Sequence, residues 1–252
     1  MTRFASRLLP LVALVAAIGL WWFLRWVFGW QSFVLPSPSE VARELWHQRS
    51  FLPREAWTTL AETLEGFAIA IAVGFALAVV IAYSRPLERS FYPLLVALNA
   101  VPKLALAPIL VLWMGFGSGP KVVMVVLLCV FPIVLSTATG LKSTAAELDE
   151  LVRSLTATEL QAFTKVRFPA ALPHIFVGLK VGISLAVIGA VIGEFVGATH
   201  GLGYVIVASG QNADTTLAFS AIVLLAVMSV VLFYVLVALE ALLVPWASHE
   251  QQ

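Results

Sequence analysis

The amino-acid sequence predicts an all-helical protein that crosses a membrane several times, and three observations lead to this class. Only 12% of the 252 residues are charged, about half of the ~25% usual in soluble domains. The hydrophobic share is 61% and the mean hydropathy is +0.98, which excludes a water-soluble enzyme and a disordered chain. The apolar residues also gather in runs of about 20, the length that spans a bilayer core of about 30 Å. We therefore expect residues 1–252 to form a single transmembrane domain.

Six such runs predict six membrane-spanning helices. They lie at residues 8–24, 66–84, 90–115, 122–141, 172–197 and 215–239. The first run ends in Trp21, Trp22 and Trp26, and such aromatic residues favour the interface belt of a retained helix over a cleaved signal peptide. Lys and Arg are more frequent in the loops that become cytoplasmic when both termini are inside, so this orientation is predicted.

The segments outside the spans divide the chain into two parts. Residues 1–56 hold the first span and an external loop, and residues 57–246 hold the core. In the external loop a turn precedes Ser39, the predicted N-cap of a short amphipathic helix at the outer interface. Residues 115–120 form a turn between two spans and not a phosphate-binding loop, because Pro120 stands where that motif requires glycine.

The stretch between the fourth and fifth runs is charged and predicts two short helices on the cytoplasmic side. Thr144–Glu147 and Thr158–Gln161 each form a capping box, and apolar residues follow both at helical spacing. Pro169 is expected to end the second helix. The first helix is acidic, which suits a protein partner better than an anionic lipid surface.

This stretch carries a resemblance to a known family. Glu150-Leu-Val, three residues, Thr156, nine residues and then Val166-Arg-Phe-Pro169 match the spacing of E-A-A-x3-G-x9-I-x-L-P. That motif is typical of type I ABC importer permeases, the inner-membrane components of binding-protein-dependent uptake systems. Residues 33–41, 107–117 and 201–203 resemble the nitrate, taurine and alkanesulfonate branch. Permeases for pyrimidine-type vitamin precursors and riboflavin look similar around residues 189–197.

The resemblance implies a function and a set of partners. The chain would be a permease of the bacterial inner membrane whose homodimer forms the pathway for a small solute, such as a sulfonate, taurine, nitrate or a vitamin precursor. Two separate ABC ATPase subunits would bind ATP, and a periplasmic or lipid-anchored binding protein would deliver the solute. No cofactor is expected on this chain itself.

The resemblance also assigns a role to residues 142–171, which we name the coupling segment. Its expected contacts with the ATPase are Glu150, Leu151, Arg153, Leu155, Thr156, Ala157, Phe163, Val166 and Pro169. Thr156 replaces the glycine of the family motif. Because a β-branched residue disfavours a positive φ angle, we expect either a turn of different shape or a softer bend.

Charged and small residues inside the spans give further candidates. Lys103 lies in a span interrupted by prolines, and Glu194 lies near the outer end of its span. Each of these two either lines the pathway or pairs structurally, whereas Lys180 is expected to reach back to the interface. The fifth span also carries a ridge of small residues that allows close helix contact between two copies, within one chain, or both. Its glycines are Gly182, Gly189, Gly193 and Gly197.

Other classes of protein fit the sequence less well. An ion-gradient-driven secondary transporter or channel is the alternative, but the sequence lacks the internal repeat and paired mid-bilayer polar groups expected of one. The four histidines are scattered, and Cys129 is the one cysteine, so we predict neither a catalytic site nor a metal site. A net charge of +1 gives no footprint for nucleic acid.

Overall fold

A computed structural model gives the fold, and it describes residues 3–144 and 146–246. For some residues of these ranges the structure describes the backbone but not the side chain. They are residues 3–11, Leu14, Arg85, Glu88, Tyr92, Ala146, Asp149, Leu151 and Arg153. The described residues form helices joined by turns and contain no β-strand. The prediction of an all-helical chain is therefore confirmed.

Eleven α-helices follow one another in the described ranges, with a 3-10 turn at Lys103–Leu106 and a π turn at Phe163–Arg167. In chain order they are α1 (Arg3–Phe28), α2 (Pro38–His47), α3 (Leu52–Tyr83), α4 (Arg85–Ala100), α5 (Ala107–Met114), α6 (Gly119–Lys142), α7 (Ala146–Ser154), α8 (Glu159–Ala162), α9 (Phe168–Phe195), α10 (Leu202–Gln211) and α11 (Thr215–Leu243).

Four helical stretches of the described chain are long and apolar enough to cross a membrane: α3, α6, Glu159–Phe195 and α11. A fifth crossing results if α4 and α5 count as one span, since they are bent by 77° at a short break. These five lie on the second to sixth predicted spans. The first predicted span lies on α1, where Val15–Phe28 is a shorter apolar helix. The chain is thus a multi-pass membrane protein, and the sixth span stays a prediction.

The core of the protein forms where α3, α6 and α9 pack against one another. At its centre, buried side chains join the three helices, with Phe67 from α3, Ile133 from α6 and Ile183 from α9. α11 lies along α9, and Lys180 of α9 forms an ion pair with Glu240 of α11 at 2.7 Å. Glu240 lies in the last turn of α11, and the expectation that Lys180 reaches back to the interface stays a prediction.

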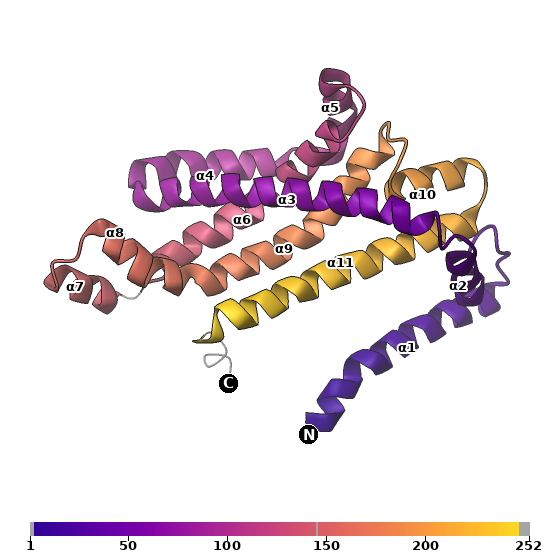
Figure 1. The fold of residues 1–252 in the computed structure, drawn as a ribbon, viewed down its shortest axis with the longest axis horizontal. Coiled ribbons are helices and arrows are strands. Elements are labelled where there is room, and N and C mark those ends of the chain that lie inside the picture. Colours follow the sequence, from indigo (N-terminus) through magenta and orange to yellow (C-terminus); the bar gives the residue numbers. More distant parts are fainter. Residues whose placement is uncertain (1–2, 145, 247–252) are drawn as a thin grey trace.

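Figure 1 shows which segments lie at each end of the helix bundle. α2 and α10 lie at one end, and α7 with α8 lies at the other. α1 diverges from the bundle and is held near its C-terminal end, where Arg25 pairs with Glu40 of α2 at 2.8 Å. Trp21 adds a hydrogen bond from its indole N–H to the Pro36 carbonyl at 3.1 Å.

The N-cap of α2 differs from the prediction. Ser37, and not Ser39, caps the helix: its hydroxyl accepts the Glu40 N–H at 3.2 Å. The Glu40 carboxylate accepts the Ser37 N–H in return at 2.8 Å. Ser37 has a glutamate three residues later and Ser39 does not, so only Ser37 can form a reciprocal capping box.

Pro169 does not end a helix, contrary to the prediction. The chain stays helical from Glu159 to Phe195, with the π turn just before the proline. The N–H of Phe168 donates to the carbonyl of Phe163, the wider bond of a π turn. Proline has no N–H to donate and its ring requires room in the preceding turn, and this local widening provides it.

Candidate functional site

The coupling segment lies at the end of the bundle opposite α2 and α10, and its first helix is α7 (Figure 1). Ala145 lies outside the described residues, and the predicted first capping box that contains it cannot be placed. α7 ends in a tight turn, where the N–H of Ala157 donates to the carbonyl of Val152 at 3.3 Å. This bond spans six residues and places Thr156 at the position where Schellman turns usually carry glycine.

Thr156 adopts the left-handed conformation that a glycine would take, with a φ angle of 51°. Neither a differently shaped turn nor a softer bend is needed to accommodate it. The left-handed conformation costs a residue with a Cβ about 1–2 kcal/mol. The turn between α7 and α8 therefore retains a strain that glycine would remove.

The second helix of the coupling segment begins at the predicted capping box. The Thr158 hydroxyl accepts the Gln161 N–H at 3.3 Å, and the Gln161 side chain accepts the Thr158 N–H at 2.9 Å. From there α8 continues through the π turn into α9. α8 is thus the N-terminal end of the long helix Glu159–Phe195.

Three leucines among the described side chains of this segment are exposed, and the first of them, Leu148, is 44% exposed. Leu155 is 68% exposed and Leu160 is 71% exposed, whereas the ring of Phe163 packs against Tyr83 and Phe168. Leu160 was missed in the sequence, where Thr158–Gln161 was interpreted only as a cap. The remaining predicted contacts vary in exposure: Glu150 is exposed, and Ala157, Val166 and Pro169 are half-buried. The side chains of Leu151 and Arg153 lie outside the described residues.

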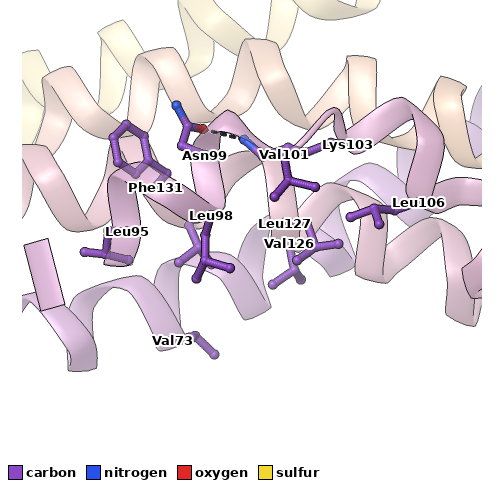
Figure 2. Close-up of a pocket in the computed structure, with 11 residues that line it drawn as sticks. Val73, Leu95, Leu98, Asn99, Val101, Lys103, Leu106, Val126, Leu127 and Phe131 are labelled. Carbon is purple, nitrogen blue, oxygen red and sulfur yellow. Dashed lines mark hydrogen bonds between the residues drawn. The ribbon is translucent and has the colours of Figure 1, made fainter. Parts of the chain in front are cut away.

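Lys103 lies at the break between α4 and α5. Its ammonium donates to the Asn99 side-chain oxygen at 2.5 Å, and both residues line a cavity of about 320 Å³. Figure 2 shows the two side chains joined at the edge of this cavity. Lys103 is only half-buried in a single chain.

Glu194 is buried, with 1% of its surface exposed, and it holds the start of α10. Its carboxylate accepts the Thr59 hydroxyl at 2.7 Å and the Gly203 N–H at 2.5 Å. The Thr59 hydroxyl accepts the Leu202 N–H at 2.8 Å. The first N–H groups of a helix have no partner within the helix and carry partial positive charge, so these contacts satisfy them. Glu194 therefore has structural partners within the chain, and its pathway-lining role stays a prediction.

Two further carboxylates surround this point. Glu55 accepts the Gly201 N–H at 2.6 Å, and Glu62 forms an ion pair with Lys121 of α6 at 2.5 Å. With Thr59 and Glu194, these residues form what we name the buried polar network. Its members on α3 were missed in the sequence, although Glu55, Thr59 and Glu62 recur at helical spacing on one face.

The glycine ridge of α9 faces α6 of the same chain. A Cβ on Gly189 would lie 2.8 Å from the Val125 Cα, and one on Gly193 would lie 2.7 Å from the Lys121 Cα. Gly182 lies against Phe67 and Ile133 of α3 and α6. Gly197 follows α9 with a φ angle of +101°. The close approach that the ridge predicted therefore occurs within one chain.

Comparison with known proteins gives a consistent family. Residues 68–249 match the model of a protein family that is described as "Binding-protein-dependent transport system inner membrane component". The chain is 36% identical to the formylaminopyrimidine transport permease protein ThiX of Halalkalibacterium halodurans, over 99% of this chain and 100% of that protein. It is 35% identical to the riboflavin transport system permease protein RibX of Chloroflexus aurantiacus, over 87% and 83% of the two chains.

Two other similarities extend this picture. The taurine transport system permease protein TauC of Escherichia coli is 29% identical, over 96% of this chain and 91% of that protein. Among solved structures, an inward-facing conformation of the MetNI methionine ABC transporter contains a chain with the same fold. Its TM-score is 0.68 at 22% identity, and the match covers 76% of this chain and 95% of that one.

Proposed function

Because the chain belongs to the binding-protein-dependent transport system inner membrane components, and is thus a permease subunit of an ABC importer, we propose that two copies form the pathway. Each copy docks one separate ATPase subunit through the coupling segment, at α7 and α8. A binding protein delivers a small solute to the opposite end of the bundle.

The exposed apolar end of the coupling segment is the observation that carries this proposal. Leu155 and Leu160 are both more than two-thirds exposed. Leu155 lies in the turn after α7 and Leu160 lies on α8, beyond the core of the bundle. Apolar side chains gathered in this way at a protein surface mark a partner site. Since α8 runs on into α9, a partner bound here could move a membrane-spanning helix directly.

We propose six spans with both termini in the cytoplasm. The Lys and Arg bias of the loops supports this orientation, as does the placement of α2 and α10 opposite α7 and α8 (Figure 1). A reporter enzyme fused after Gln211 should then indicate the outside, and one fused after Thr158 the cytoplasm. A cytoplasmic result at Gln211 would contradict the topology.

The names of the relatives point to two kinds of solute. ThiX and RibX are named for heterocycles, formylaminopyrimidine and riboflavin. TauC is named for taurine, and further relatives are named for aliphatic sulfonates and nitrate. We propose a solute from this range.

Charging the exposed leucines tests the docking. Leu155→Asp and Leu160→Asp place a carboxylate where an apolar contact would form, and each buried leucine contributes about 1.5–3 kcal/mol. We expect each variant to reduce ATPase co-purification by about 10-fold or more, with insertion unchanged. The matched control is Phe33→Asp at the opposite end, where the ring is 64% exposed and no ATPase can reach. Full ATPase retention by both leucine variants would refute the proposed dock.

A further inference from the structure

The break between α4 and α5 lies within the third predicted span, so its polar groups are expected at membrane depth. α4 ends at Ala100, and Pro102 precedes the 3-10 turn that carries Lys103. The two helices meet there at 77°. Irregular backbone and a charged side chain are tolerated at this depth only against protein or a water-filled cavity. Because Lys103 is half-buried in the single chain, its open side faces one of these and not lipid.

A cavity of about 320 Å³ adjoins the break, at the lower end of the size range of small-molecule sites. Its walls are apolar and come from three helices, with Val73 on α3, Leu98 on α4 and Phe131 on α6. Figure 2 shows these side chains around the space, with the linked pair Asn99 and Lys103 at its edge. A ligand here would meet hydrocarbon on most sides and one polar point.

The polar groups of the cavity wall are Lys103 and Asn99, and together they offer mainly hydrogen-bond donors. Lys103 has three N–H donors, and the Asn99 oxygen accepts one of them at 2.5 Å. This bond turns the amide oxygen towards the lysine, so the amide contributes its two N–H donors to any further partner. Of the eleven residues that line the cavity, all within the described ranges, none is acidic. The positive charge therefore has no counter-charge in the cavity wall.

A cation in an apolar cavity attracts an anion far more strongly than it would in water, because the surrounding dielectric is low. We propose that this cavity is a solute-binding site of the permease and that its ligand is a small organic anion, such as an alkanesulfonate. The anionic group binds Lys103 and the Asn99 amide, and the apolar body lies against Leu98 and Phe131. This inference rests on the proposed function and adds to it the chemical class of the solute.

A pair of isosteric probes tests the charge requirement. The permease–ATPase complex is placed in nanodiscs, and binding of 1-pentanesulfonate and of its neutral analogue pentane-1-sulfonamide is measured by saturation-transfer NMR. Lys103→Met should weaken sulfonate binding by about 10-fold or more, the usual effect of losing a charged hydrogen bond. Lys103→Arg should retain it. Binding of the sulfonamide should change much less in both variants.

Two further variants keep the outcome clear. Lys103→Gln keeps a hydrogen-bond donor but removes the charge, so it should also lose sulfonate binding. This variant tests the charge independently if methionine disturbs the fold. The double variant Lys180→Met with Glu240→Gln removes a different lysine of the spans together with its partner, and it should bind like wild type. Sulfonate binding that survives both Lys103→Met and Lys103→Gln, or that is absent in wild type, overturns the anion site. Co-purification of the ATPase is measured in the same samples, and its absence in wild type would overturn the proposed function instead.

Discussion

Replacing Gly193 by alanine tests whether the glycine ridge holds the chain together from within. The added Cβ would lie 2.7 Å from the Cα and 3.0 Å from the Cβ of Lys121. The nearest atom belongs to the backbone and cannot rotate away, so α6 and α9 must separate. Lys121 also carries the buried ion pair with Glu62 at 2.5 Å, and any shift of α6 disturbs it.

The expected loss of stability follows from two opposing effects. Inserting a methyl group into a packed interface costs about 1–3 kcal/mol. Alanine in place of glycine inside a helix returns about 0.5–1 kcal/mol. The net loss is therefore about 0–2.5 kcal/mol. It increases if the Lys121–Glu62 pair opens, because a buried charge without its partner costs about 3–5 kcal/mol.

Thermal unfolding of the purified full-length protein measures this loss. Gly210→Ala is the control, because a Cβ there meets nothing within 4 Å, and it should leave the melting temperature unchanged or slightly higher. The Gly193→Ala loss should not depend on protein concentration, since the contact lies within one chain. A variant as stable as wild type, or a loss that appears only on dilution, would refute the reasoning and return the ridge to a contact between two copies.

Two other predictions concern the turns that hold short helices in place. Thr156→Gly removes the strain of a left-handed threonine, which costs the folded state about 1–2 kcal/mol. Glycine loses more conformational freedom on folding, which offsets about 0.5–1 kcal/mol of this gain. Hydrogen exchange at the Ala157 amide should therefore slow by up to several-fold, and faster exchange would contradict the strain. In the external loop, the hydrogen bond from Arg25 holds the pKa of Glu40 at about 2, below its ordinary value of 4.5. The attachment of α2 to α1 should thus be complete above pH 4.5 and be lost as the pH falls towards 2, whereas Glu40→Gln should expose residues 29–36 to protease already at pH 7. Equal proteolysis of this variant and wild type at pH 7 would show that the pair does not hold the helices together.

Most of the membrane-spanning helices could be predicted because lipid imposes one strong constraint. Every backbone group within the bilayer must find a partner inside its own helix, so a long apolar run is almost enough to identify a span. The same local logic predicted the cap at Thr158, whose reciprocal partner is only three residues away. It failed at Pro169, because the rule that proline ends a helix assumes that the preceding turn is α-helical, and here that turn is wider.

The pairing of charged residues could not be predicted in the same way. Lys180 is 60 residues from Glu240, and Thr59 is 135 residues from Glu194. Periodicity shows which face of a helix is polar but not which other helix it meets. The spacing of Glu55, Thr59 and Glu62 did contain a signal, since three polar side chains share one face at the start of an apolar helix. That signal predicts a buried polar partner without identifying it.

The proposed ATPase dock and the buried polar network share one continuous helix. The continuous helix from Glu159 to Phe195 has 37 residues, so it is about 55 Å long at 1.5 Å per residue. Leu160 is exposed near its first turn, and Glu194 near its last turn holds the N–H of Gly203 in α10. A rod of this kind can carry a displacement along its length, although its α-helical hydrogen-bond pattern is interrupted by the π turn at Phe163–Arg167 and by Pro169 and Pro173, which have no N–H to donate. We infer that movement of α8 by a docked ATPase reaches α10 at the opposite end through α9, so substitutions at Glu194 should alter transport without altering the dock itself.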